Sequence, residues 1–371
     1  MNLRTQPTLN SNQYIDLPEP YKLHRGGTIC HIKIAFESWG TLNKKKDNVI
    51  VILTGLSPDA HAASSARCPR VGWWEFMLGQ GKPIDTDKYF VICINSFGSC
   101  KGSTGPTTIN DATGQPFGPD FPVLSIEDIA CTAKLALQEM GIERVHTLIG
   151  PSMGGMSALA YALLYPDRVD QLAIISSAQA ATPFAIAIRS LQREAIRSDP
   201  NWSNGWYYND EYPISGMRLA RKLGVISYRS AEEWQQRFGR AKIDELRKIE
   251  ALTQMEFEVE SYLEAHAQRF VGSFDPNSYL ALSHAMDLFD ANDYGQTNTD
   301  AYSRLEIKKA LVIGVHTDIL FPEHQQQEIA EALESSGAEV TYKGLDSLQG
   351  HDAFLVDKKQ FAPIMSQFLN D

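Results

Sequence analysis

Short, continuous hydrophobic runs recur along the first half of the chain. They occupy residues 49–53, 89–94, 145–149 and 172–175. Runs of this length and kind are expected for parallel strands that are buried on both faces. Residues 27–39 instead alternate apolar and polar positions, which predicts a half-exposed strand at the edge of the sheet, where the sheet starts. Residues 126–139 carry a helical repeat of apolar positions. Strands that alternate with helices predict an α/β fold with a mostly parallel sheet.

The segment between residues 177 and 309 lacks strand-like runs and has helical periodicity. The predicted helices cover residues 183–196, 217–223, 231–238, 243–253, 258–270 and 277–288. Residues 310–315 and 338–342 then predict two further strands, and residues 353–369 predict a closing helix. We therefore expect a sheet domain with an inserted helical lid. The expected division is 1–180 for the first part of the core, 181–300 for the lid and 301–371 for the second part of the core.

Gly150-Pro151-Ser152-Met153-Gly154 joins one predicted strand to one predicted helix. This is the G-x-S-x-G pattern of a nucleophilic serine on a sharp strand-to-helix turn, where glycines leave room for neighbouring backbone. The pattern arises by chance often enough that it needs support from other residues. Such a serine also needs backbone N–H donors for the oxyanion. Met153 supplies one by position, and Leu56, in the loop after residues 49–53, is the candidate for the other.

Support comes from the order of the chain. In α/β-hydrolases an acid and then a histidine follow the serine, each in a loop after a later strand. Asp318 follows the predicted strand 310–315, and His351 follows the predicted strand 338–342. Asp318 is the candidate acid and His351 the candidate base. The sequence thus predicts an α/β-hydrolase fold with a Ser-Asp-His triad.

Composition and charge exclude several other classes of protein. The chain has 34 basic and 45 acidic residues and a net charge of −11, which argues against nucleic acid as a partner. Five cysteines without C-x-x-C spacing indicate neither a disulfide framework nor a zinc knuckle. No histidine cluster has metal-ligand spacing, so we expect no metal and no permanently bound cofactor. Neither a signal pattern nor a membrane-spanning run is apparent, so we expect a soluble, cytoplasmic protein.

Several segments resemble the homoserine O-acetyltransferase family of α/β-hydrolases. They are Val71-Gly72-Trp73-Trp74-Glu75, residues 81–90, residues 101–106, Ser152-Met153-Gly154-Gly155-Met156 and residues 350–355. The resemblance runs from about Gly26 to the carboxyl terminus and includes the lid. It implies transfer of an acyl group from acyl-CoA to the hydroxyl of a small amino acid, through an acyl-serine intermediate. It also implies a homodimer formed through the lid helices.

The same resemblance assigns roles to individual residues. Ser152 would be the nucleophile, His351 the general base and acid, and Asp318 the orienting carboxylate. Arg221 and Asp352 would bind the amino-acid acceptor. Pairing the acceptor's carboxylate with a guanidinium and its ammonium with a carboxylate makes physical sense for a zwitterion.

Two departures from the acetyltransferases bear on the substrate. The loop that contains Leu56, Ser57, Pro58 and Asp59 differs from the family's shorter loop, and Arg189 stands where an asparagine is usual. An arginine there could meet the free carboxylate of a succinyl group. Both features resemble the branch of the family that succinylates serine, with succinyl-CoA as co-substrate. Arg189 could equally be an ordinary surface residue of a helix.

Four alternatives remain open at this stage. One methylene separates serine from homoserine and is worth only about 1–3 kcal/mol in an apolar pocket. Homoserine O-acetyltransferase, homoserine O-succinyltransferase and serine O-acetyltransferase activities are therefore alternatives. An esterase or thioesterase, with water as acceptor, is a more remote alternative. A binding module without catalysis is disfavoured by the intact Ser152, Asp318 and His351.

Overall fold

A computed structural model describes the chain apart from residues 1–12, 18–19, 209–210, 244–254 and 371. Its main sheet has eight strands in the order β1-β4-β8-β5-β11-β12-β13-β14. In that order they are β1 (Gln13–Leu17), β4 (Ile32–Trp39), β8 (Phe90–Ile94), β5 (Val49–Leu53), β11 (Val145–Pro151), β12 (Val169–Ile175), β13 (Lys309–Val315) and β14 (Glu339–Leu345). The β1–β4 and β4–β8 pairs are antiparallel, and all other pairs are parallel. The predicted, mostly parallel sheet is confirmed.

Alternate residues of the inner strands face two separate hydrophobic cores. On β5, Val49, Val51 and Leu53 belong to one core, and Ile50 and Ile52 belong to the other. Helices α1 (Ile126–Glu139), α2 (Met153–Leu164) and α9 (Glu323–Ser335) contribute to the first core. Helix α11 (Lys358–Asn370) contributes to the second. Burial on both faces explains why these strands read as continuous hydrophobic runs.

The edge-strand prediction for residues 27–39 is wrong. β4 lies inside the sheet, because β1 pairs with its outer side, and residues 28–29 form a separate strand, β3 (Thr28–Ile29), with β2 (Tyr21–Lys22). The alternation also does not mean half exposure here, because Glu37, a polar position of β4, is buried against His61. A buried, hydrogen-bonded carboxylate in a strand leaves the same sequence pattern as an exposed one.

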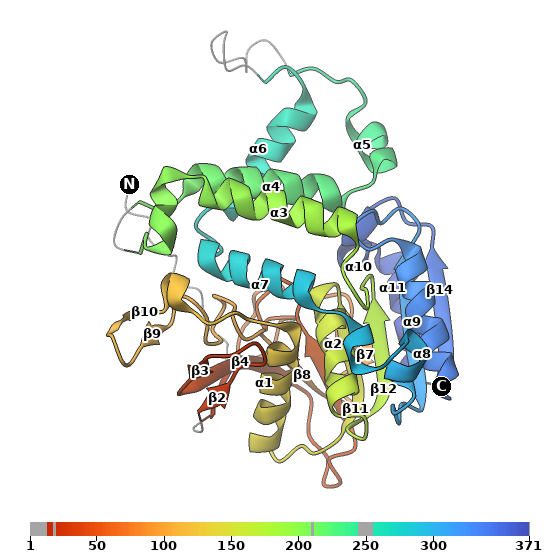
Figure 1. The fold of residues 1–371 in the computed structure, drawn as a ribbon. Coiled ribbons are helices and arrows are strands. Elements are labelled where there is room, and N and C mark those ends of the chain that lie inside the picture. The colour runs from red at the N-terminus through yellow and green to blue at the C-terminus, as the bar shows by residue number, and fades with distance from the viewer. Residues whose placement is uncertain (1–12, 18–19, 209–210, 244–254, 371) are drawn as a thin grey trace.

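Within the described residues, helices α3 to α7, which follow β12 in the chain, form the lid, and the lid lies over one end of the sheet in Figure 1. They are α3 (Pro183–Arg197), α4 (Ile214–Tyr228), α5 (Ala231–Phe238), α6 (Glu258–Phe270) and α7 (Pro276–Leu288). The chain leaves and returns side by side, since Ala180 and Asp290 form an isolated antiparallel bridge. The helical insertion is confirmed. The predicted helix at 243–253 lies, from residue 244 on, outside the described residues, and the exact division into 1–180, 181–300 and 301–371 stays a prediction.

The predicted closing helix over 353–369 is two helices, α10 (Ala353–Val356) and α11. Asp357 breaks the helix with φ −87° and ψ 65°. Its carboxylate accepts hydrogen bonds from the Ser347 hydroxyl at 2.8 Å and from the Gln360 N–H at 3.3 Å. An aspartate that binds the backbone of the next turn is a helix-starting residue, which a pattern of apolar positions does not reveal.

The remaining elements are short. They are β6 (Leu78–Gly79), β7 (Ile84–Asp85), β9 (Ile109–Asn110), β10 (Gln115–Pro116), α8 (Asn298–Tyr302), and the 3-10 helices η1 (Gly118–Asp120), η2 (Pro200–Gly205), η4 (Ala291–Tyr294) and η5 (Gly350–Asp352). Among the described residues, no helix combines the length and the apolar character that crossing a membrane requires.

Candidate active site

Ser152 sits at the turn between β11 and α2 in a strained backbone conformation. Its φ of 56° and ψ of −126° lie in a region that residues with a side chain rarely adopt. Close packing makes the flanking glycines necessary. A Cβ on Gly154 would lie 2.0 Å from the Leu53 carbonyl oxygen, and one on Gly150 would lie 2.2 Å from the Gly154 carbonyl oxygen. The turn therefore projects the serine side chain away from the sheet at the carboxyl end of β11.

The structure brings Ser152, Asp318 and His351 together, although 199 residues separate the serine from the histidine. His351 Nε2 lies 2.9 Å from Ser152 Oγ, and His351 Nδ1 lies 2.7 Å from Asp318 Oδ2. The other Asp318 oxygen accepts the N–H groups of Leu320 and Phe321, both at 2.9 Å. Two backbone donors and the imidazole thus fix the carboxylate, and the carboxylate fixes the ring.

Burial and charge act in opposite directions on the His351 imidazole. Burial lowers its pKa, but the charge and hydrogen bond of Asp318, with a smaller contribution from Asp352, raise it more. The net pKa of His351 is raised above its ordinary value. The Phe321 ring stacks on the imidazole with centroids 5.0 Å apart, which restrains its rotation. The ring is therefore held in place and made more basic than a free histidine.

A cavity opens directly above Ser152 and His351. Residues from the core loops and from three lid helices or their ends line it. They are Gly55, Leu56, Ser57, Pro58, Trp73, Pro151, Ser152, Arg189, Gln192, Ser227, Tyr228, Tyr279, Met286, Leu320, His351, Asp352, Phe354 and Leu355. Trp73, Tyr228 and Tyr279 line the cavity but were not predicted as site residues from the sequence. Trp73 lies in a segment that carried the family resemblance, which is the one signal that could have singled it out.

The loop after β5 lies next to the serine. A Cβ on Gly55 would be 3.9 Å from Ser152 Cβ, so this loop passes close to the Ser152 side chain. Within the described residues, the Leu56 N–H donates to no other backbone group. Met153 is the first residue of α2, and the N–H groups of a first helical turn have no partner within the helix. Leu56 lines the same cavity as Ser152, and both N–H groups are free of backbone partners in the described residues, so their role as oxyanion donors stays a prediction.

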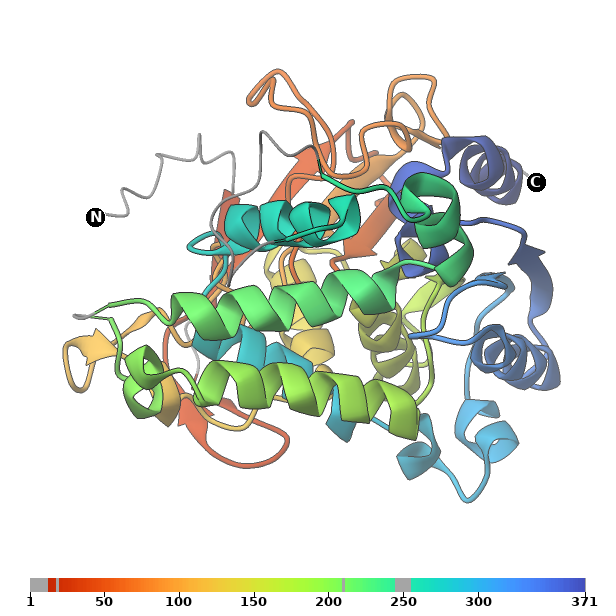
Figure 2. The ribbon, with the colours of Figure 1, turned by 90° about the horizontal axis from the view of Figure 1, so that it is seen from above.

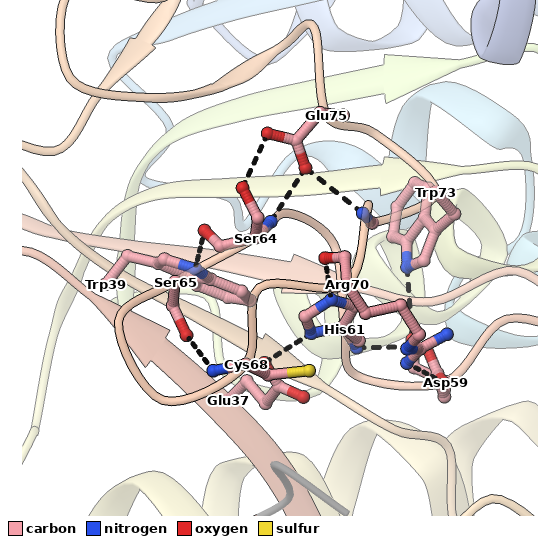
Figure 3. Close-up of polar contacts among 11 residues, drawn as sticks. Glu37, Trp39, Asp59, His61, Ser64, Ser65, Cys68, Arg70, Trp73 and Glu75 are labelled. Atoms are coloured by element: carbon pink, nitrogen blue, oxygen red, sulfur yellow. Dashed lines mark hydrogen bonds and ion pairs between the residues drawn. The ribbon is translucent and has the colours of Figure 1, made fainter. Parts of the chain in front are cut away.

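Figure 3 shows how the end of this loop is anchored. His61 is buried, with Nδ1 2.9 Å from a Glu37 carboxylate oxygen and Nε2 2.7 Å from the Arg70 carbonyl. The Trp73 indole N–H donates to the Asp59 carbonyl at 3.1 Å. The Asp59 carboxylate binds Arg70 Nη2 at 2.8 Å and the His61 N–H at 3.1 Å. The Asp59 side chain thus contacts Arg70 and His61 and does not line the cavity. Leu56, Ser57 and Pro58 do line it.

Arg189 is buried, so the alternative of a surface residue is wrong. Its Nε lies 2.6 Å from Asp287 Oδ1, and Arg193, one turn later on α3, places Nη2 2.7 Å from Asp287 Oδ2. Among the described residues, Arg189 Nη1 and Nη2 have no hydrogen-bond partner. Two guanidinium groups thus share one carboxylate, which leaves one net positive charge buried at the cavity wall. Such an arrangement favours an anionic ligand.

Arg221 and Asp352 occupy different positions relative to the cavity. Asp352 lines it, and its Oδ2 lies 3.1 Å from Arg229 Nε. The Arg221 guanidinium lies 4.6 Å from the Phe270 ring centroid and 5.8 Å from that of Tyr228, which lines the cavity. Arg221 itself is not a lining residue, and its buried Nε has no partner within the described part of the chain. It stands behind Tyr228, on the same face of α4.

Sequence comparison assigns the family. Residues 48–358 match the model of the alpha/beta hydrolase fold. A serine O-succinyltransferase from Litchfieldella anticariensis is 52% identical over 361 residues, which cover 97% of this chain and 98% of that protein. The chain belongs to the α/β-hydrolase family of homoserine O-acetyltransferases and serine O-succinyltransferases. The predicted fold and family resemblance are confirmed.

Solved structures agree with this assignment. The crystal structure of homoserine O-acetyltransferase from Bacillus anthracis superposes with a TM-score of 0.88 at 29% identity, covering 97% of each chain. The crystal structure of esterase E22 gives a TM-score of 0.86 at 28% identity and covers 96% of this chain and 99% of that one. The lid is part of the shared architecture, because both superpositions extend over nearly the whole chain.

Proposed function

We propose that this protein is a serine O-succinyltransferase, which moves the succinyl group of succinyl-CoA to the hydroxyl of L-serine. The identity of more than half of its residues to a serine O-succinyltransferase supports the family branch. The observation that carries the acyl choice is Arg189, which lines the Ser152 cavity and whose Nη1 and Nη2 have no hydrogen-bond partner among the described residues. A succinyl carboxylate would neutralise the excess charge of the Arg189, Arg193 and Asp287 cluster, whereas an acetyl group would leave it unpaired.

The first half-reaction acylates Ser152. His351 Nε2 takes the hydroxyl proton as Ser152 Oγ attacks the thioester carbonyl, and the N–H groups of Leu56 and Met153 bind the oxyanion. The intermediate collapses as the carbon–sulfur bond breaks, and His351 returns the proton to the thiolate. CoA leaves as the free thiol, and a succinyl ester remains on Ser152.

The second half-reaction uses the same groups in reverse. His351 takes the proton from the hydroxyl of L-serine, whose oxygen attacks the succinyl-Ser152 carbonyl. Collapse releases O-succinyl-L-serine and returns the proton to Ser152 Oγ. Asp352 would bind the acceptor's ammonium, and Arg221 its carboxylate, so the zwitterion orients the hydroxyl. Asp352 lines the cavity, whereas Arg221 would reach its ligand beside Tyr228.

A matrix of two donors and two acceptors tests the proposal. Succinyl-CoA and acetyl-CoA are each paired with L-serine and L-homoserine, and the products are identified by mass. Succinyl-CoA with L-serine should give the largest kcat/KM. Fastest turnover of acetyl-CoA with homoserine would refute the branch assignment.

Hydrolysis is the second candidate, because esterase E22 shares the fold and nearly the full length. An esterase would release CoA from succinyl-CoA without an amino acid, at the rate seen with one. The charged residues around the cavity favour transfer, since water needs neither Arg221 nor Asp352. CoA release that depends on L-serine separates the two functions.

The pH dependence follows from the role of His351 as base. The imidazole must be neutral to accept a proton, so activity should fall as the pH drops through its raised pKa. Asp318→Asn removes the main interaction that raises that pKa. We expect the acidic limb of the kcat/KM profile to move to lower pH, and the rate at its plateau to fall about 10⁴-fold. An acidic limb that stays in place would contradict the assignment of this limb to His351.

A homodimer through the lid is the proposed assembly. Phe184 and Leu191 on α3, and Leu219 and Ile226 on α4, are each about half exposed, and each pair is spaced seven residues apart. That spacing places each pair on one face of its helix, and Figure 2 shows α3 and α4 lying side by side on the outside of the lid. Light scattering should give twice the mass of one chain. Leu191→Asp with Leu219→Asp should give monomers, whereas Ile109→Asp, at an exposed position of β9, should leave the dimer intact.

A further inference from the structure

The end of lid helix α4 is packed against the loop that carries His351. Gly350, with φ +59°, has no room for a side chain, because a Cβ would lie 2.9 Å from the Tyr228 carbonyl oxygen and 3.0 Å from the Ser230 nitrogen. The Ser230 hydroxyl donates to the Leu348 carbonyl. These contacts hold residues 228–230 and the His351 loop together as one unit.

Arg229 adds a charged contact to this junction. Its Nε lies 3.1 Å from Asp352 Oδ2, and its Nη1 lies 2.8 Å from Glu233 Oε1, one turn into α5. The side chains of Arg229 and Asp352 are only 16% and 22% exposed. Within the described residues the ion pair with Arg229 is the one polar contact of the Asp352 carboxylate, and Oδ1 has no partner although Asp352 lines the cavity. One carboxylate oxygen is therefore held by the lid, and the other is left for a ligand.

We propose that Arg229 is a positioning residue for the acceptor. By binding Oδ2 it orients the Asp352 carboxylate so that Oδ1 receives the ammonium group of an α-amino acid beside His351. The inference rests on the proposed function, because it concerns the second half-reaction of that function. It adds a residue that touches neither the acyl donor nor the reacting atoms.

Arg229 also influences the pKa of Asp352. Burial raises the pKa of Asp352, and Arg229 is the strongest of the interactions that oppose this rise. The other charged groups that face Asp352 are His351 and Arg221, which also lower its pKa, and Asp318, which raises it. Without Arg229 the pKa of Asp352 would rise further, and the protonated acid would no longer attract an ammonium group.

The test separates the two half-reactions in Arg229→Gln. We expect the KM for L-serine to rise about 10- to 100-fold, the range for a lost hydrogen bond to a charged group. CoA release from succinyl-CoA in the first turnover should be unchanged. The KM of this variant should fall as the pH is raised, because Asp352 then ionises without Arg229. Glycerate has a hydroxyl but no ammonium group, so Arg229→Gln and the unaltered protein should use it as acceptor at the same rate.

Two further variants complete the experiment. Arg229→Lys keeps the charge and should restore most of the affinity for L-serine. Arg218→Gln is the matched control, because Arg218 lies on α4 and pairs with Glu264 rather than with a cavity residue. Its kinetics should equal those of the unaltered protein.

Equal losses in both half-reactions of Arg229→Gln, or an unchanged KM for L-serine, would overturn the proposal. Failure of the proposed function shows independently, in the unaltered protein. If that protein prefers homoserine, the same variants are measured with homoserine, whose ammonium makes the identical demand on Asp352.

Discussion

Replacing Ser152 with alanine is expected to reduce kcat at least about 10³-fold, because no other group can carry the acyl chain between CoA and the acceptor. Alanine meets the same backbone strain as serine at φ 56°, so the variant should remain folded. Mass spectrometry of the unaltered protein, quenched after mixing with succinyl-CoA alone, should find one succinyl group on the peptide that contains Ser152. The alanine variant should carry none.

Ser157→Ala is the matched control for this experiment. Ser157 lies on α2, one turn beyond the nucleophile, is buried, and donates to the Met153 carbonyl at 3.1 Å. Its loss should leave turnover near that of the unaltered protein. Unchanged turnover in Ser152→Ala would contradict covalent catalysis at this serine, and a succinylated peptide elsewhere would identify a different nucleophile.

Replacing Arg189 with asparagine should reverse the acyl preference. We expect kcat/KM for succinyl-CoA to fall about 10²-fold or more, since removing one partner of a desolvated charge pair costs about 3–5 kcal/mol. Asp287 keeps Arg193 as its partner at 2.7 Å, so the wall of the cavity is left with no net charge. Acetyl-CoA, which has no carboxylate to pair, should lose little or gain. The measurement is the ratio of kcat/KM for the two donors with L-serine.

Arg197→Asn provides the control, because Arg197 lies two turns further along α3 and is exposed. The ratio for this variant should match that of the unaltered protein. If Arg189→Asn left the donor ratio unchanged, Arg189 would be a structural partner of Asp287 and the succinyl carboxylate would bind elsewhere.

Local patterns were sufficient for most of the sheet and for the order of the candidate triad. The strands and glycines around Ser152 produce their own sequence signal, because burial on both faces and close backbone approach each restrict residue type. Asp318 and His351 follow from strand order alone. Glu37 shows the limit, since a buried polar side chain and an exposed one are indistinguishable in an alternating strand. Residues 13–17 carried no strand prediction, and because β1 pairs with the outer side of β4, the predicted edge strand lies inside the sheet.

Contacts between residues far apart in the chain could not be predicted from the sequence. Arg189 depends on Asp287, which is 98 residues away, for its burial and its unbalanced charge. The pairing of Asp352 with Arg229 likewise exists only once the lid has folded back onto the core. The sequence could suggest that Arg189 and Asp352 meet ligands, but which of their polar atoms remain available is a property of the folded structure.

The contact between Gly350 and the end of α4 limits how the enzyme can open. Leu348, Gly350 and Asp352 all hold residues 228–230, so a lid that lifted at this end would carry His351 away from Ser152. Water that entered through that movement would then reach the proposed acyl-Ser152 ester without His351 beside it as a base. Opening at this end would therefore not speed hydrolysis of the proposed acyl-Ser152 ester. The acceptor could react with this ester only when the contact between Gly350 and residues 228–230 is in place.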